Sequence, residues 1–230
     1  MKLQKDIFCE GEANAWYDRN YDNVSVFDSD RDPIIRNVVS YLRPGMAIAE
    51  VGCALAGRLN ALVEMAQGRG LGLDPSEKAI SDASIRYPEL QLSRGTADVL
   101  PWEDRAIDIL IYGFCLYLCD RADLFRIAAE GDRVLSEGGI IVIFDFKPPF
   151  PYKNRYMHRD GSFSYKLDYS SLWSWNPDFV RIREEICDHV MVNCSGGRQD
   201  VILPDDRIAV TILQKVGPFA YQNSPVYGEE

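Results

Sequence analysis

The stretch Met46-Ala-Ile-Ala-Glu50-Val-Gly52-Cys-Ala-Leu-Ala-Gly57 decides the fold of this chain. Its first half is a short apolar run that ends in an acid, which is typical of a strand buried in a sheet. Its second half is a loop of small residues, after which Gly57 opens a helical pattern that continues to Ala66. A strand, a tight loop and a helix begin a βαβ unit, and its loop lies at the carboxyl edge of a parallel sheet.

Two further acids repeat this arrangement at the same spacing. Asp74 closes Gly70-Leu-Gly-Leu-Asp74 and Asp98 lies in Gly95-Thr-Ala-Asp98, so 24 residues separate Glu50 from Asp74 and Asp74 from Asp98. That period equals one strand, one helix and their connections. Acids at three successive strand ends would line one edge of the sheet, where open α/β folds bind ligands. Neighbouring carboxylates suit a nucleoside ligand, which is rich in hydrogen-bond donors.

Apolar periodicity along the rest of the chain predicts an α/β sheet with seven strands and one late antiparallel hairpin. Strands are expected at 47–51, 71–73, 90–92, 107–112, 140–145 and 207–216, the last one paired with a strand within 180–192. Helices are expected at 12–20, 32–42, 57–66, 76–87 and 123–135, and a turn at Gly138-Gly139. Residues 1–44 are expected to form an N-terminal helical cover. Residues 45–230 are expected to form one domain, with a lid insertion at about 147–178.

Composition and charge exclude several classes of function. The net charge of −10 and the sequence pI near 4.8 argue against binding to nucleic acid or to an anionic membrane, because both need a basic surface. The chain has no apolar stretch long enough to span a bilayer. Six cysteines without paired spacing and only two histidines favour reduced thiols over disulfides or a metal site, so no metal is predicted. The expected location is the cytoplasm.

Five motifs in order resemble the class I S-adenosylmethionine-dependent methyltransferases, over about residues 45–146 and more loosely to the end. The motifs are Glu50-Val-Gly52-Cys-Ala-Leu-Ala-Gly57, Gly72-Leu-Asp74-Pro-Ser76, Gly95-Thr-Ala-Asp98-Val-Leu-Pro-Trp102, Ile107-Asp-Ile-Leu-Ile-Tyr112-Gly-Phe114 and Arg133-Val-Leu-Ser-Glu-Gly-Gly-Ile-Ile-Val-Ile143. None is specific alone, but their order and spacing are. The resemblance implies a Rossmann-like, doubly wound seven-stranded sheet and S-adenosylmethionine as cofactor, with S-adenosylhomocysteine as product.

The resemblance also implies roles for individual residues. Gly52 would let the backbone approach the methionine part of the cofactor, with Glu50 orienting this loop and reaching the ammonium. Asp74 would accept the ribose hydroxyls and Asp98 the adenine amino group. The remaining residues expected around the cofactor are Cys53, Pro75, Ala97, Val99, Tyr112 and, from the N-terminal cover, Tyr17.

Two alternatives stay open at this point. Gly52-x-Ala-x-x-Gly57 is close to the dinucleotide fingerprint, with Asp74 near the distance of a ribose-binding acid, so a NAD(P)-dependent oxidoreductase is one. Two loop positions that are usually glycine are Ala54 and Ala56, and alanine destabilises a position that requires a positive φ. A catalytically silent fold-mate that binds a nucleoside or a partner protein is therefore the other.

The segment after the fifth strand differs in composition from the rest. It is rich in aromatic residues, and residues 147–166 hold five Lys or Arg against one acid, Asp160. In an acidic protein this bias suggests a small anionic or sugar-containing substrate, such as a phosphorylated or nucleotide-linked saccharide, methylated on oxygen or nitrogen. His158 is the candidate general base, since its ordinary pKa suits proton removal near neutral pH. The candidate substrate-binding residues are Arg155, Arg159, Tyr117 and Tyr156.

Overall fold

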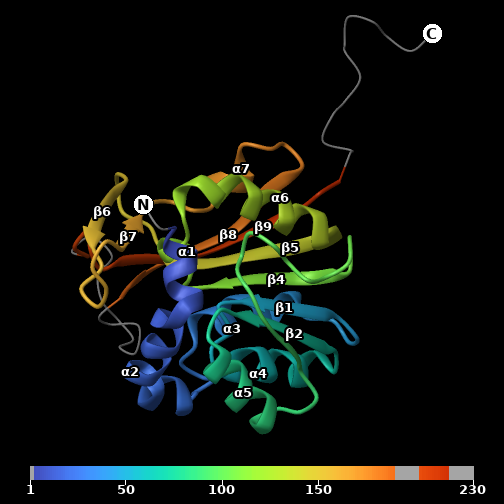
Figure 1. Cartoon of the computed structure of the whole chain (residues 1–230). Helices are drawn as coiled ribbons and strands as arrows, with labels where there is room; N and C mark the ends of the chain where they lie inside the picture. Colours follow the sequence, from blue (N-terminus) through green and yellow to red (C-terminus); the bar gives the residue numbers. More distant parts are fainter. Residues whose placement is uncertain (1–2, 190–201, 218–230) are drawn as a thin grey trace, which may run out of the picture.

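The computed structural model describes residues 3–189 and 202–217, which form a seven-stranded sheet with helices on both faces (Figure 1). The strands of this sheet are β1 (Ala47–Val51), β2 (Arg69–Asp74), β3 (Gln91–Arg94), β4 (Ile107–Gly113), β5 (Leu135–Phe146), β8 (Phe179–Asp188) and β9 (Arg207–Lys215). Their order is β3-β2-β1-β4-β5-β9-β8. Strands β3 to β5 pair in parallel, and β9 pairs antiparallel to both neighbours. The chain direction along the sheet therefore reverses between β1 and β4, which is a topological switch point.

Two apolar layers sandwich the sheet. On one face, buried residues of β1, β4, β5 and β9 pack against α3 (Pro33–Val38), α4 (Gly57–Ala66) and α5 (Glu77–Arg86). On the other face, the intervening residues of the same strands pack against α6 (Leu124–Val134) and α7 (Ser171–Ser174). Figure 1 shows α4 and α5 at the base of the molecule and α6 and α7 above the strands. Strands covered on both faces explain the apolar runs without polar alternation.

Local signals in the sequence account for where helices begin. Asp32 caps α3, since its carboxylate accepts from the backbone N–H groups of Ile34 and Ile35, and Pro33 occupies the first helical position, as predicted. The Ser76 hydroxyl accepts from the backbone N–H of Ala79 and caps α5.

Several predicted boundaries were wrong. The first predicted helix runs to Ser25 rather than to residue 20, and the second strand starts at Arg69 rather than at residue 71. The third strand runs to Arg94, beyond the predicted end at residue 92, because it follows the edge of β2 to Asp74. The Gly138-Gly139 turn does not precede the fifth strand. It lies inside β5, which already starts at Leu135, and the register with β4 shifts there. The predicted partner of the last strand is β8, and residues 190–192 of the predicted range lie outside the described residues.

Two segments lie outside the main sheet. The N-terminal one comprises α1 (Gln4–Ile7), η1 (Phe8–Glu12), α2 (Ala13–Ser25) and, after α3, η2 (Val39–Tyr41). The other is an antiparallel hairpin of β6 (Tyr152–Arg155) and β7 (Phe163–Lys166), which stands beside the carboxyl ends of the central strands in Figure 1. Two short helices, η3 (Leu116–Leu118) and η4 (Arg121–Asp123), follow β4. Among the described residues, none of the helices is long and apolar enough to cross a membrane.

Candidate cofactor site

A cavity of about 130 Å³ opens at the carboxyl edge of the sheet, next to the switch point between β1 and β4. Six of the predicted site residues line it: Gly52, Asp74, Pro75, Ala97, Asp98 and Tyr117. They come from the ends of β1 and β2, the segment after β3 and the helix after β4. The strand-end acids at the 24-residue spacing are thus brought to one edge, although only Asp74 and Asp98 reach the cavity wall.

The loop after β1 approaches the cavity through its backbone. Gly52 has φ of +77°, and a Cβ there would come within 2.8 Å of the Cβ of Cys115, so no side chain fits. Ala54 and Ala56 also adopt left-handed conformations, with φ of +45° and +60°. A left-handed conformation costs an L-residue roughly 1–2 kcal/mol. The positive φ that the sequence analysis left open is thus present at both alanines. Neither alanine lines the cavity, and the space beside Gly52 stays open.

Asp74 holds this loop in place. Its Oδ2 accepts from the backbone N–H of Ala54 at 2.9 Å, and its Oδ1 accepts from the backbone N–H of Ser76 at 2.8 Å. Burial raises the pKa of Asp74 to about 6, and these two hydrogen bonds offset part of that rise. Each carboxylate oxygen has two acceptor positions, so Asp74 keeps capacity for ligand donors.

Glu50 lies behind the cavity wall and not in it. Its Oε1 accepts from Arg58 at 2.5 Å, and the same guanidinium bonds Asp32 at 2.8 Å. A Cβ on Gly113, which does line the cavity, would be 2.5 Å from Glu50 Oε1. Burial raises the pKa of Glu50 to about 7 against the lowering effect of Arg58. No sequence pattern indicated Arg58, although it is the ion-pair partner of the first motif acid.

These residues fit a nucleoside cofactor with a charged tail. Gly52 and Gly113 line the cavity with backbone, and a Cβ at either position would clash with Cys115 or with Glu50. Asp74 and Asp98 present carboxylates to the cavity, which suit hydroxyl and amino donors. Among the described residues, Glu50 Oε2 is a buried oxygen without a hydrogen-bond partner, and the next residue in the chain, Val51, lines the cavity. The cluster of Glu50, Asp32 and Arg58 carries one excess negative charge when both acids are ionised, so a cationic group nearby would balance it.

Besides Glu50, four predicted cofactor residues do not reach the cavity wall. Val99 is 61% exposed, and Cys53 is buried beneath the loop. The Tyr112 side chain lies on the face covered by α6, where its hydroxyl donates to the carbonyl of Ile127. Tyr17 is buried and donates to Asp82, so its neighbour Trp16 is the α2 aromatic that lines the cavity. The choice between adjacent aromatics depends on how α2 is rotated, which its weak apolar periodicity did not indicate.

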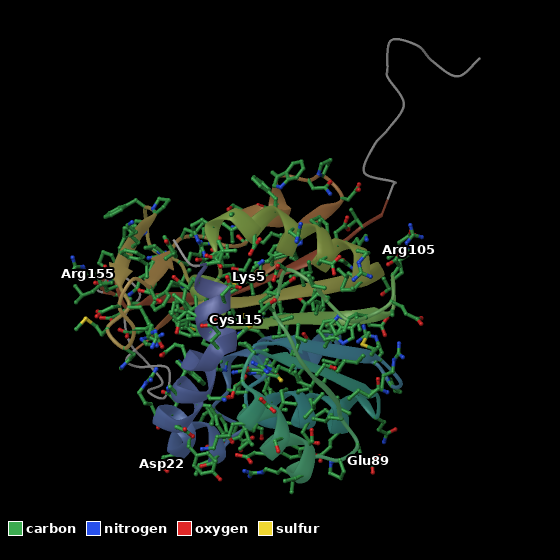
Figure 2. The ribbon with its side chains drawn as sticks, in the orientation of Figure 1. Lys5, Asp22, Glu89, Arg105, Cys115 and Arg155 are labelled. Carbon is green, nitrogen blue, oxygen red and sulfur yellow. The ribbon has the colours of Figure 1, made fainter. Side chains whose placement is uncertain are left out.

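The predicted catalytic and substrate-binding residues of the lid lie mostly on the hairpin surface. His158 is exposed and makes an edge contact with the ring of Tyr156, at 5.4 Å between centroids. Tyr156 in turn bonds Arg19 and Glu12 of the N-terminal segment, so it joins the hairpin to that segment. Arg155 points outward, away from Lys5 and Cys115, which mark the cavity in Figure 2. Arg159 is exposed as well.

An aromatic cluster borders the cavity where β4, β5 and β8 end. Phe114, which has φ of +60°, and Tyr117 line the cavity, and both rings pack against Phe146. His189, just after β8, stacks on Phe114 at 5.2 Å between centroids with 9° between the planes. Burial lowers the pKa of His189, and Lys166 lowers it further, which favours the neutral imidazole. This edge of the cavity is therefore aromatic, with the Lys166 ammonium 4.0 Å from the centre of the Phe146 ring.

Two thiols, Cys115 and Cys119, also line the cavity. Burial raises the pKa of both, to about 12 for Cys119, so both are neutral thiols near pH 7. The described residues hold no group of three or more His, Cys, Asp or Glu arranged for a metal ion. The cavity wall offers carboxylate acceptors, the Lys5 ammonium, the two thiols, backbone groups and aromatic surface.

Comparison with known proteins identifies the domain. Residues 49–143 match a family model described as a methyltransferase domain. The chain is 29% identical over 143 residues to demethylmenaquinone methyltransferase of Bacillus cereus, which covers 53% of this chain and 60% of that protein. It is 26% identical over 116 residues to a ubiquinone/menaquinone biosynthesis C-methyltransferase of Campylobacter jejuni, covering 46% and 47%. The chain thus spans between about half and three fifths of the length of these curated relatives.

Solved structures agree in fold. An S-adenosylmethionine-dependent methyltransferase of Methanosarcina mazei has a TM-score of 0.61 and 17% identity, over 80% of this chain and 98% of that one. Residues 49–143 of this chain are therefore a methyltransferase domain, and the fold is that of the class I S-adenosylmethionine-dependent methyltransferases. The resemblance, the Rossmann-like fold and the cofactor predicted from the sequence are confirmed.

Proposed function

We propose that this protein is an S-adenosylmethionine-dependent methyltransferase that acts on a small molecule. One observation carries the proposal: in a methyltransferase domain, Gly52, Asp74 and Asp98 line a single cavity at the switch point of the sheet. Bound S-adenosylmethionine would supply an electrophilic methyl group. The protein's own residues would bind, orient and shield the reactants, which is where most of the rate gain of such transfers lies.

The cavity suggests a task for each of these residues. Asp74 would accept the ribose hydroxyls while it keeps the loop bound through Ala54 and Ser76. Asp98, at the other end of the cavity, would accept the adenine amino group. Gly52 and Gly113 would admit the methionine portion, with Glu50 behind them providing the negative charge that its ammonium requires. Pro75 and Ala97 would contact the nucleoside, since both lie in the wall.

The N-terminal cover and the lid would exclude water from this cavity. Four side chains of the N-terminal segment form one wall, namely Lys5, Phe8, Ala13 and Trp16. The hairpin of β6 and β7 reaches this segment through Tyr156, which bonds Glu12 and Arg19. These contacts support residues 1–44 as a cover over the cavity and about 147–178 as its lid.

The identity of the methyl acceptor remains a prediction from the sequence. Of the five cations in residues 147–166, Lys147 pairs with Asp168 and Glu184, and Lys166 pairs with Asp205. Lys153, Arg155 and Arg159 have no acid partner among the described residues, and Lys153 lies over the ring of Phe163. Arg155 and Arg159 remain the predicted contacts of an anionic or sugar-containing substrate, and both are exposed on the hairpin. The role of His158 as the base and the choice of oxygen or nitrogen as the acceptor atom also remain predictions from the sequence. The relative whose name specifies a C-methyltransferase makes carbon a second candidate acceptor.

The pH dependence of cofactor binding tests this assignment. If Asp74 accepts the ribose hydroxyls as a carboxylate, protonation removes that acceptor. The pKa of about 6 means that Asp74 is ionised at pH 7.5 and mostly protonated at pH 5. The Kd for S-adenosylhomocysteine should therefore rise about tenfold as pH falls from 7.5 to 5. Calorimetry at both pH values measures it. Asp74→Asn should show a smaller change because its amide does not titrate, and the change that remains is expected from Glu50, whose pKa of about 7 lies in the same pH range. Equal pH dependence in both proteins would remove Asp74 from the ribose site.

A further inference from the structure

The first helical segment of the chain is hydrogen-bonded both to the segment after β4 and to the β6–β7 hairpin. We call residues 3–12, which form α1 and η1, the N-terminal strap. The Gln4 side chain donates to the carbonyls of Leu118 and Phe163, at 2.6 and 2.9 Å, and accepts from the backbone N–H of Phe163 at 3.0 Å. The backbone N–H groups of Gln4 and Lys5 both donate to the carboxylate of Asp120. The strap backbone is thus fixed to the segment after β4 and to the hairpin.

The side chain of Lys5 extends from this strap into the cavity wall. Its ammonium lies 2.7 Å from Asp98 Oδ2 and 2.8 Å from Asp123 Oδ2. Both acids also line the cavity. Hydrogen bonds to Asp123 and then Asp98 raise the pKa of Lys5, so it is fully charged at neutral pH. Lys5, which Figure 2 labels on α1, lines the cavity together with Cys115.

Asp98 is consequently occupied at both oxygens. Its Oδ1 accepts from the Thr96 hydroxyl at 2.7 Å, and its Oδ2 accepts from Lys5. Burial alone would raise the pKa of Asp98, but the hydrogen bonds from Lys5 and Thr96 outweigh burial and lower it. Oδ2 has a second acceptor position, but an adenine amino group there would share the oxygen with a charged ammonium, so the two donors compete for it. The Lys5 ammonium can then remain paired with Asp123, which lies 2.8 Å from it.

We propose that Lys5 is a displaceable cap on Asp98, which the adenine amino group replaces when the cofactor binds. This inference rests on the proposed function. In the described structure Lys5 ties the strap to the acid that would recognise adenine. On exchange, the ammonium keeps its bond to Asp123, and the strap stays in place through Gln4 and Asp120. Lys5 therefore lowers the affinity for the adenosyl ligand, while the position of the strap does not depend on its bond to Asp98.

Calorimetry with S-adenosylhomocysteine tests the exchange. Lys5→Met removes the competing donor and should lower the Kd by about three- to tenfold, as expected for a partly exposed ion pair. Lys5→Arg keeps the competing charge and should retain the wild-type Kd. Lys78→Met is the matched control, because Lys78 pairs with Asp18 on the surface, outside the cavity. Thermal unfolding of each variant checks that the fold is intact.

A second ligand tests whether the adenine amino group is the replacing donor. S-Inosylhomocysteine carries a keto oxygen at that position, which cannot donate to Asp98 and can accept from Lys5. Its Kd should not fall in Lys5→Met. The exchange is overturned if the Kd of Lys5→Met for S-adenosylhomocysteine is unchanged or raised, or if the affinity for both ligands increases equally. The proposed function stands in these cases, provided that the wild-type protein binds S-adenosylhomocysteine. Absence of binding by the wild-type protein would overturn the proposed function as well.

Discussion

Replacing Asp74 with alanine should weaken S-adenosylhomocysteine binding by about 10- to 150-fold. The substitution removes the acceptor of the ribose hydroxyls, and a hydrogen bond to a charged group is worth about 1.5–3 kcal/mol. It also frees the backbone N–H groups of Ala54 and Ser76, which Asp74 now accepts. The left-handed conformation at Ala54 then loses its support. Calorimetry gives the affinity, and thermal unfolding gives the cost to the fold.

Asp74→Asn separates the two effects. The asparagine oxygen can still accept one backbone N–H, so the loop should be better preserved, while the negative charge toward the ribose is lost. The Kd should therefore fall between those of the wild type and Asp74→Ala. Wild-type affinity in Asp74→Ala would show that this acid serves the loop alone.

Gly52→Ala is the second substitution with a large expected effect. The new Cβ would meet the Cβ of Cys115 at 2.8 Å, and φ of +77° disfavours any L-residue. Overpacking of 1–3 kcal/mol adds to a conformational cost of about 1 kcal/mol, so the free energy of unfolding should fall by about 2–4 kcal/mol. Affinity for S-adenosylhomocysteine should fall as well, because the cavity-lining backbone has to move. Denaturant unfolding and calorimetry measure these two quantities.

Gly45→Ala is the matched control for conformational strain. Gly45 has nearly the same φ, +82°, but nothing lies within 4 Å of a Cβ built there. This variant should lose only about 1 kcal/mol and keep its cofactor affinity, since Gly45 precedes β1 and is remote from the loop. Equal destabilisation of the two variants, with affinity preserved in both, would contradict the close approach inferred at Gly52.

The order of elements and the place of the site were accessible from the sequence because both depend on local patterns. Apolar runs, the caps at Asp32 and Ser76 and the 24-residue period of acids led to the sheet and to its ligand-binding edge. Asp74 and Asp98 reach the cavity for the same reason, since the ends of parallel strands meet at one edge.

Contacts between distant segments could not be predicted in this way. Lys5 is 93 residues from Asp98, and no periodicity relates the two. Arg58 sits inside an ordinary amphipathic helix, and its pairing with Glu50 depends on how α4 packs on β1. The wrong choice of Tyr17 over Trp16 came from helix rotation, which only the tertiary packing sets. The basic bias of the lid was visible, but not that Lys147 and Lys166 would find acid partners within the chain.

Titration of the intact protein with S-adenosylhomocysteine and with NAD, at pH 7.5 in the same calorimeter, tests the central claim most directly. The cavity between Asp74 and Asp98, with Gly52 at its other side, should bind S-adenosylhomocysteine as a single site. Saturating S-adenosylhomocysteine should also raise the melting temperature, because a ligand that binds only the folded state stabilises it. NAD should do neither. Binding and stabilisation by NAD without either effect from S-adenosylhomocysteine would contradict the account and favour a dinucleotide-dependent oxidoreductase.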